Sequence, residues 1–195
     1  MTPRRVATLV AVGALVVGLG WLMFSFLERR LSAPTPDAEP VTPAAETPAA
    51  VGPHISAILY FVSEDGTLLE PRAMDVPLRD SPAAQARALV EAQLAATPPE
   101  PLTRAVPEGV TVRGVFLTGR DDAYVDLDGT FVSALPGGSH NELMAAYAIV
   151  SVLTTNLTPI TRVQILIDGR EVETLTGHVD LREPLRKNEG LIHVP

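Results

Sequence analysis

The amino-acid sequence predicts an α+β fold in which a mixed or antiparallel sheet carries two helices on one of its faces. Three observations support this class. Alternating apolar residues from Val163 run into an Asp168-Gly169 turn and a second β-prone stretch, which is the strongest short-range hairpin signal. One helix pattern opens at Ser81-Pro82, and a second runs from Leu143 to Leu157. Since strands and helices are mixed along the chain, helices packed on a sheet are the economical arrangement.

The first 30 residues predict a membrane anchor. Val6 to Leu27 is an apolar run of about the ~20 residues that a helix needs to cross a bilayer. Arg4 and Arg5 before the run are almost balanced by Glu28, Arg29 and Arg30 after it, so the orientation rests on the free N-terminal amine and on the acidic stretch that follows Arg30, which favour a cytoplasmic N-terminus. A cleavable signal peptide that ends near Leu31-Ser32-Ala33 is the competing interpretation. The run is long for a signal, so we expect an uncleaved, single-pass inner (cytoplasmic) membrane anchor and an extracytoplasmic (periplasmic) C-terminal domain.

The chain divides by composition into an anchor (1–30), a Pro/Ala-rich linker (31–54), a folded domain (55–187) and a short tail (188–195). Proline at the density found in the linker forbids helix and sheet and favours extended conformers. The formal net charge of −8 argues against nucleic acid as a partner, because nucleic acid needs a basic surface. The chain has no cysteine, which excludes a lipoprotein anchor, disulfides, thiol catalysis and zinc–thiolate sites.

The first half of the domain predicts a hairpin followed by a helix. Ala57 to Val62 is a β-type run, and Ser63 to Gly66 leads to a short return at Thr67 to Leu69. Ser81 is a suitable N-cap with proline at the first helical position, so a helix is expected over Ala83 to Ala96. The prolines that follow Thr97 end it.

The second half predicts two strands, a helix and a closing hairpin. Strands are expected over Val110 to Leu117, Ala123 to Leu127, Arg162 to Ile167 and Glu171 to Leu175. Ser139 and Glu142 have the spacing of a capping box that opens the second helix. The apolar face of this helix is expected at positions with helical spacing: Leu143, Ala146, Tyr147, Val150, Leu153 and Leu157.

Five short motifs, taken in order, are similar to the GerMN domain family, which is named for spore germination and sporulation proteins. They are LYF at 59–61, VPEGV at 106–110, AYVDL at 123–127, PGGSHNEL at 136–143 and GHVDLREPL at 177–185. The resemblance covers about Ser56 to Leu185 as a single copy, whereas some relatives carry two. It implies an α/β fold similar to the ring-building motifs of envelope-spanning secretion assemblies. It also implies a non-catalytic module that assembles or docks a partner.

Two motifs invite a chemical interpretation that the surrounding residues do not support. The stretch Asp126-Leu127-Asp128-Gly129 resembles the start of a calcium loop, but no carboxylate follows twelve residues after Asp126, so a strand end and turn is the better interpretation. Ser139-His140 places a hydroxyl beside an imidazole, but adjacent residues do not by themselves form a catalytic triad.

No catalytic, cofactor-binding or metal-binding residue is predicted. The carboxylates Asp126, Glu142 and Asp168 could converge as a glycosidase pair would, yet each has a turn or capping role. The histidines lack a metal-ligand spacing: His54, His140, His178 and His193.

Two functions remain open. The first is a non-enzymatic scaffold of the bacterial envelope, related to sporulation or germination, that binds a protein partner or its own copies. An open edge at Glu171 to Leu175, or an aromatic of the Tyr60-Phe61 pair on an uncovered sheet face, would serve it, although core packing of both aromatics is the stronger expectation. The alternative is a peptidoglycan-associated module that assists a wall hydrolase such as an amidase. Glycan sites favour exposed aromatics, and the one tryptophan, Trp21, lies in the anchor, which favours the protein partner.

Overall fold

The computed structural model describes residues 52–194. The expected membrane span Val6 to Leu27, and the linker as far as residue 51, lie outside the described residues. Within residues 52–194, no helix combines the length and the apolar character needed to cross a membrane.

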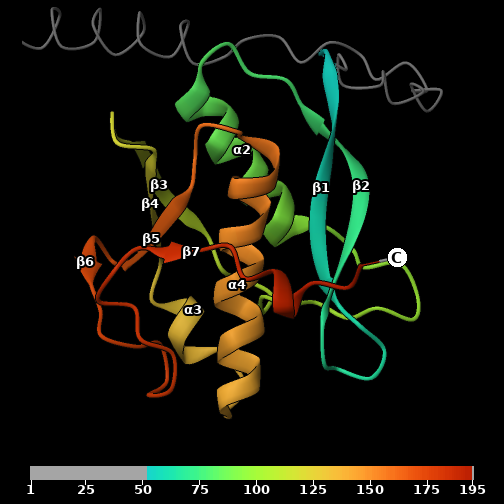
Figure 1. The fold of residues 1–195 in the computed structure, drawn as a ribbon, viewed down its shortest axis with the longest axis vertical. Helices are drawn as coiled ribbons and strands as arrows, with labels where there is room; N and C mark the ends of the chain where they lie inside the picture. Colours follow the sequence, from blue (N-terminus) through green and yellow to red (C-terminus); the bar gives the residue numbers. More distant parts are fainter. Residues whose placement is uncertain (1–51, 195) are drawn as a thin grey trace, which may run out of the picture. The chain divides into compact units, whose positions relative to one another are not determined.

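Two sheets enclose a layer of two helices (Figure 1). The hairpin of β1 (His54–Val62) and β2 (Leu69–Pro77) forms the smaller, antiparallel sheet. The larger sheet has five strands, namely β3 (Val112–Leu117), β4 (Asp122–Leu127), β5 (Arg162–Ile167), β6 (Arg170–Glu171) and β7 (Leu185–Arg186). Between the sheets stand α2 (Pro82–Ala95), which packs on β3, and α4 (Ser139–Asn156), which packs on β1 and β5. The short helix α3 (Thr130–Ser133) lies between β4 and α4, and the short helix η1 (Glu189–Leu191) follows β7 near the C-terminus.

The predicted α+β class and the mixed sheet are confirmed, but the prediction of one sheet with both helices on one face is wrong. The reason lies in α4, which is buried over nearly its whole circumference. Of its expected apolar face, Ala146, Val150 and Leu153 are fully buried, but so are Ile149 and Val152 on other sides of the helix. A helix that is apolar all round must be covered on more than one side. The β1–β2 hairpin therefore packs across the helices from the larger sheet and does not extend it.

The start of α2 agrees with its sequence signal. The Ser81 hydroxyl accepts a hydrogen bond from the Ala84 N–H at 3.2 Å, and Pro82 is the first helical residue. The capping box at α4 is wrong. Ser139 is already helical, and Gly138 is the N-cap with a φ of 115°, a value that glycine adopts readily.

The five-stranded sheet is built around the crossover through α4. β3 and β4 are antiparallel with a bulge at Arg113, and β4 and β5 are parallel. The Asp168-Gly169 turn after β5 is confirmed, with positive φ values at both residues (51° and 78°). The strand predicted over Glu171 to Leu175 is wrong, because only Arg170–Glu171 pairs with β5 and the chain then continues through turns to β7.

β2 is longer than the predicted Thr67 to Leu69. The full length of β2 was not predicted because it contains Pro71 and Pro77, and proline is depleted in strands. Both prolines occupy positions that do not need to donate to β1, as described below.

Candidate functional site

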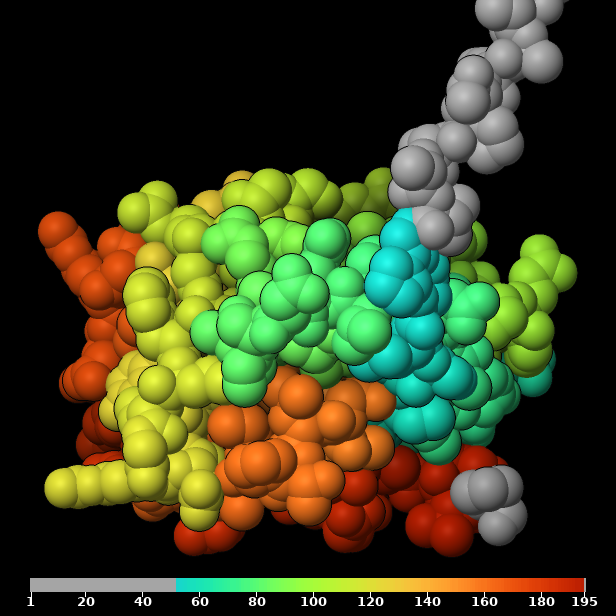
Figure 2. Space-filling view, turned by 90° about the horizontal axis from the view of Figure 1, so that it is seen from above, coloured from blue at the N-terminus to red at the C-terminus, as the bar shows by residue number. Residues whose placement is uncertain are grey.

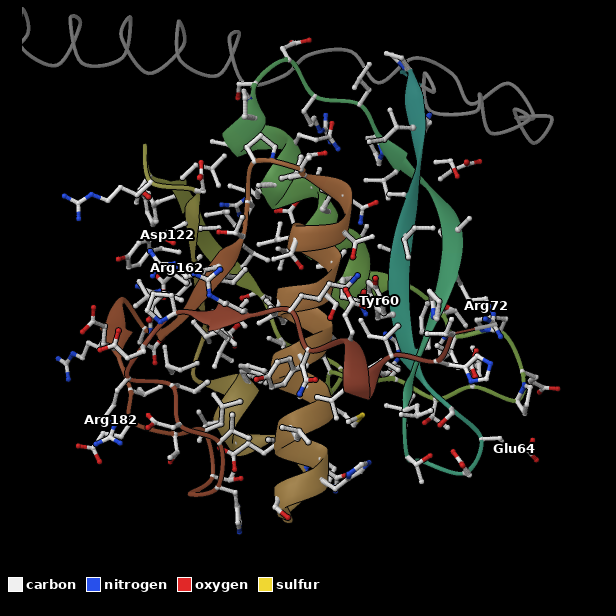
Figure 3. All side chains as sticks on the ribbon, in the orientation of Figure 1. Tyr60, Glu64, Arg72, Asp122, Arg162 and Arg182 are labelled. Carbon is white, nitrogen blue, oxygen red and sulfur yellow. The ribbon has the colours of Figure 1, made fainter. Side chains whose placement is uncertain are left out.

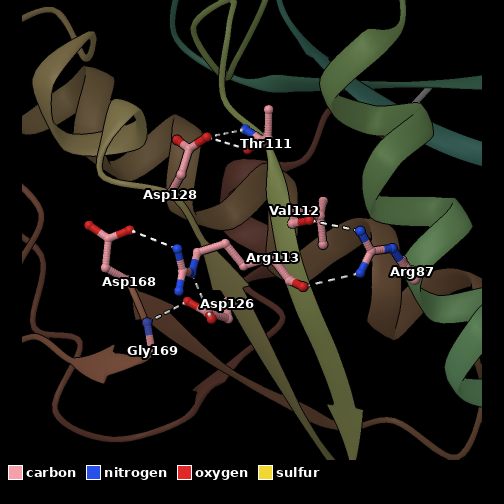
Figure 4. A network of polar contacts seen from close by, with 8 residues as sticks. All are labelled: Arg87, Thr111, Val112, Arg113, Asp126, Asp128, Asp168 and Gly169. Carbon is pink, nitrogen blue, oxygen red and sulfur yellow. Dashed lines mark hydrogen bonds and ion pairs between the residues drawn. The ribbon is translucent and has the colours of Figure 1, made fainter. Parts of the chain in front are cut away.

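The three carboxylates that the sequence suggested do not meet. The Asp126 carboxylate accepts the Gly169 N–H at 2.7 Å and the Arg113 Nε at 3.2 Å (Figure 4). The Asp168 carboxylate lies 3.5 Å from Nη1 of the same arginine. Two carboxylates on one guanidinium fix the β5–β6 turn to the bulge of β3, and Glu142 is not part of this network. The cluster has a structural role.

The calcium-loop motif is also explained by structure. The Asp128 carboxylate accepts hydrogen bonds from the Thr111 hydroxyl, from the Thr111 N–H at 3.0 Å and from the Thr130 N–H at 3.0 Å. The hydrogen bond from the Thr111 side chain, which is the largest cause, lowers the pKa of Asp128 despite its partial burial. Within residues 52–194, no group of three His, Cys, Asp or Glu side chains is placed to hold a metal ion.

Glu142 anchors the C-terminal segment 172–184 to α4. Its fully buried carboxylate accepts hydrogen bonds from the backbone N–H groups of Leu175, His178 and Val179 at 2.9 Å, 3.0 Å and 3.2 Å, and from the Thr176 hydroxyl at 2.8 Å. Burial by itself would raise the pKa of Glu142, but the donors from Thr176, Val179 and Leu175 together outweigh it and lower the pKa to about 2. The residue predicted as half of a capping box is thus the ionised centre of a loop anchor.

The adjacent Ser139 and His140 do not form a catalytic pair. Ser139 begins α4, whereas the His140 imidazole Nε2 contacts the Gly66 carbonyl in the β1–β2 turn. The Tyr60 and Phe61 side chains are both buried, so the stronger expectation, core packing on both sides, is confirmed. Tyr60 lies between β1 and α4, where its hydroxyl is 2.7 Å from Thr155 Oγ1 (Figure 3).

The edge of β1 that faces the helices is closed by side-chain amides. Asn156 of α4 accepts the Ile58 N–H and donates to the Ile58 carbonyl, both at 2.8 Å. Gln93 of α2 does the same for Tyr60, at 2.8 Å and 2.6 Å. Further along, Val62 pairs with Thr103 through two backbone hydrogen bonds of 2.9 Å. Each amide replaces the neighbouring strand residue that this edge lacks.

The outer edge of β2 is protected in another way. The Leu78 N–H donates to the Pro53 carbonyl, and alternation along the antiparallel register then points every second residue of β2 away from β1. Two of these outward positions are Pro71 and Pro77, which have no N–H to offer. A third, Leu69, is bridged by Ile192. Prolines and the C-terminal residues thus limit strand pairing at this edge to the outward groups of Ala73 and Asp75.

β3 has no such protection over its second half. The Thr118 N–H donates to the Asp122 carbonyl, so alternation directs the backbone groups of Phe116 and Gly114 toward β4 and those of Val115 and Leu117 away from it. Among residues 52–194, no strand pairs with β3 on that outer side. We call the outward N–H and C=O groups of Val115 and Leu117 the open edge.

At the first half of β3 the edge is closed by an arginine. The guanidinium of Arg87, on α2, donates to the Val112 carbonyl at 2.8 Å and to the Arg113 carbonyl at 3.2 Å (Figure 4). It also pairs with Glu91 at 2.7 Å. Arg87 therefore marks where the open edge begins.

The sheet face beside the open edge, which the helices leave uncovered, carries exposed aromatic surface. Phe116 is 60% exposed, and Tyr124 on the neighbouring strand β4 is half-buried. Beyond them Arg162 holds Asp122 through two hydrogen bonds of 2.6 Å and 2.8 Å (Figure 3). An exposed phenylalanine next to unpaired backbone groups is typical of an interaction surface.

An apolar pocket of about 400 Å³ lies at the end of the open edge. Leu117 contributes one wall, and Leu78, Ser81 and Pro82 at the start of α2 contribute another. Leu157 and Ile160, after α4, contribute a third. Figure 2 views this end of the domain, where the starts of β1 and α2 and the end of α4 surround the pocket. Its volume is within the range of ligand-binding pockets.

Comparison with known proteins agrees with this fold. The family Germane, described as sporulation and spore germination, matches residues 58–173, which is more than half of the chain. The tandem GerMN domains of the sporulation protein GerM from Bacillus subtilis are 20% identical with a TM-score of 0.55, covering 69% of this chain and 46% of that one. The first GerMN domain of that protein is 19% identical with a TM-score of 0.50, covering 69% of this chain and 96% of that one.

A putative lipoprotein from Clostridium perfringens is 20% identical with a TM-score of 0.49, covering 74% of this chain and 95% of that one. The curated proteins contain no match. At these identities the two GerM structures establish the fold alone, while the family match runs from within β1 to just beyond β6 and includes both long helices. The chain therefore belongs to the Germane, or GerMN, family of sporulation and spore germination.

Proposed function

We propose that this chain is a membrane-tethered, extracytoplasmic module of the bacterial envelope that binds a protein partner without catalysing a reaction. Binding takes place by strand addition at the open edge of β3. The observation that carries the proposal is the contrast between this edge and the inner edge of β1, which the amides of Asn156 and Gln93 close, together with the exposed Phe116 and the apolar pocket beside the open edge.

The absence of catalysis is proposed from how the polar groups are used. Asp126 and Asp168 share Arg113, Asp128 bonds to Thr111 and Thr130, and Glu142 accepts from the 175–179 backbone. Groups committed to structural hydrogen bonds are not available as general acids or bases. The tether is the span Val6 to Leu27 with its proline-rich linker, and the family supports a role in sporulation or germination.

Site-specific photocrosslinking in the native membrane tests the proposal. A photoreactive phenylalanine analogue replaces Phe116 in the full chain, and the same analogue at the exposed Asp75, on the edge of β2 that Pro71 and Pro77 interrupt, is the control. We expect a discrete protein adduct from position 116 and none from position 75. Val115→Pro in the same chain removes an outward N–H without touching the β3–β4 hydrogen bonds and is expected to abolish the adduct. Equal adducts at both positions would refute the proposal.

Peptidoglycan association is the second candidate, because the exposed Phe116 and the half-buried Tyr124 supply aromatic surface on the uncovered sheet face. Co-sedimentation of the detergent-solubilised full chain with purified sacculi, at low and moderate salt, separates the two. Saturable binding that survives salt and that Phe116→Ala weakens would favour the wall module. No binding would leave the protein partner as the function.

A further inference from the structure

The chemistry of the partner can be narrowed, because the open edge does not accept a second copy of this chain. α2 lies over β3. In a dimer paired edge to edge, the two β3 strands would lie about 4.8 Å apart. The two α2 helices would then be separated by roughly the same distance, whereas packed helices need about 8–10 Å between their axes. A single strand without a covering helix meets no such obstacle.

The chain's own linker is also a poor occupant. Its last proline, Pro53, accepts a hydrogen bond from the N–H of Leu78, a residue of the pocket lining, so the linker has to be considered as an occupant. In the sequence, the linker contains Pro34, Pro36, Pro40, Pro43, Pro48 and Pro53, so it has no more than four consecutive residues without a proline. Prolines at this spacing interrupt the row of N–H groups that pairing with Val115 and Leu117 requires.

The pocket adds a requirement for one side chain of the incoming strand. The side chains of Val115 and Leu117 share the sheet face that is turned to α2, and Leu117 forms part of the pocket wall. In an added strand, the residue opposite Leu117 faces the same side and therefore points toward the pocket. The lining is mainly apolar, with Leu78, Pro82, Leu157 and Ile160 among its residues, so burial of a large apolar side chain is favoured there.

We infer that the partner is an extended, proline-free segment of another protein, which pairs with Val115 and Leu117 and inserts a bulky apolar side chain into the pocket. The inference rests on the proposed strand addition and adds the identity of the anchoring residue. Main-chain hydrogen bonds provide affinity, and the pocket provides specificity.

Selection from a phage-displayed library of random dodecapeptides, on the full chain in lipid nanodiscs, tests the inference. We expect enriched peptides to share a proline-free core with Leu, Ile, Phe, Tyr or Trp at one fixed position. A synthetic peptide from the selection is then measured against three variants. Val115→Pro blocks the edge, and Leu78→Lys places a charge on the pocket wall at a residue that is 46% exposed. Val194→Lys makes the same change at an apolar residue that is 78% exposed and outside the pocket lining.

The outcomes separate the inference from the proposed function. We expect Val115→Pro to abolish binding, Leu78→Lys to weaken it at least tenfold and Val194→Lys to leave it unchanged. Loss of binding in Val115→Pro with full binding in Leu78→Lys would overturn the pocket and leave strand addition intact. A selection that yields no peptide, or peptides indifferent to Val115→Pro, would overturn both.

Discussion

The edges of β1 and β3 both lie beside a helix, but helix side chains satisfy the backbone hydrogen bonds at the edge of β1 and leave part of the edge of β3 unpaired. At β1 the helices supply Asn156 and Gln93, whose amides satisfy the backbone of Ile58 and Tyr60. At β3 the helix supplies Arg87, which reaches only the carbonyls of Val112 and Arg113. The difference shows that the fold can close an edge with side chains alone, so the unpaired groups of Val115 and Leu117 are a local feature of β3.

The largest expected effect on the free energy of unfolding is the loss caused by a proline at the edge of β1, compared with a proline at the edge of β3. Ile58→Pro removes the N–H that donates to Asn156 and should destabilise the domain by about 3 kcal/mol, because a partly buried amide oxygen loses its donor and the ring crowds it. Val115→Pro removes an N–H that has no partner within residues 52–194, and should cost about 1 kcal/mol through altered side-chain packing. Urea unfolding of a fragment of residues 49–195 measures both values. Equal losses would mean that the β3 edge is not open.

A smaller, pH-dependent effect is expected at the far side of the larger sheet. There the segment 172–184 runs beside β5, with Gln164 donating to the Leu181 carbonyl at 2.6 Å, and Glu142 holds the segment in place. The pKa of Glu142 is lowered from 4.5 to about 2, so its ionised form stabilises the fold above pH 4.5 and this contribution is lost as the pH falls toward 2.

Glu142→Gln should lower stability at pH 7 by about 2 kcal/mol, since an amide replaces one of the acceptor oxygens with a donor that faces the 175–179 N–H groups. The decline in stability between pH 5 and 2 should also become shallower than in the parent, because the other acidic groups are unchanged. Unfolding measured across this range in both proteins checks the claim. Parallel declines would show that the Glu142 carboxylate does not drive the acid response.

The sequence predicts the elements of this fold better than it predicts their packing. Local signals such as Ser81-Pro82 and Asp168-Gly169 act within a few residues, and both appear as expected. The division into two sheets depends on α4 being covered on opposite sides, which an apolar helix pattern does not specify. Val152 is an apolar residue outside the expected face of α4 and is fully buried. Its apolar character was a signal in the sequence that α4 is covered on a second side.

The site was harder to predict for a related reason. Glu142 has the spacing of a capping box, three residues after Ser139. In the structure, however, its carboxylate oxygens accept hydrogen bonds from residues that lie 33 to 37 positions later in the chain. Gln93 and Asn156 are polar residues within otherwise apolar helices, and this was an available signal that they satisfy a buried group. The open edge could not be predicted from the sequence, because Val115 and Leu117 are ordinary strand residues. Within residues 52–194 they lack a neighbouring strand because β3 is the last strand of its sheet, and strand order is not visible in the local sequence.

The smallest effect on stability is expected at Arg87, where the closed and open parts of β3 meet. Its side chain is 43% exposed and pairs with an exposed Glu91, so Arg87→Ala should cost only about 0.5 kcal/mol. The substitution frees the carbonyls of Val112 and Arg113, to which Arg87 donates, and so lengthens the open edge. One additional hydrogen bond to an incoming strand should raise the adduct yield at position 116 several-fold, given a net value of about 1 kcal/mol.

Arg182→Ala is the matched control, because Arg182 also pairs with an exposed carboxylate, Asp180, but lies away from β3. A higher yield in Arg87→Ala alone would show that the guanidinium limits the length of strand that β3 accepts. A lower yield would instead mean that Arg87 contacts the partner directly, and the boundary of the open edge would then have to be placed elsewhere.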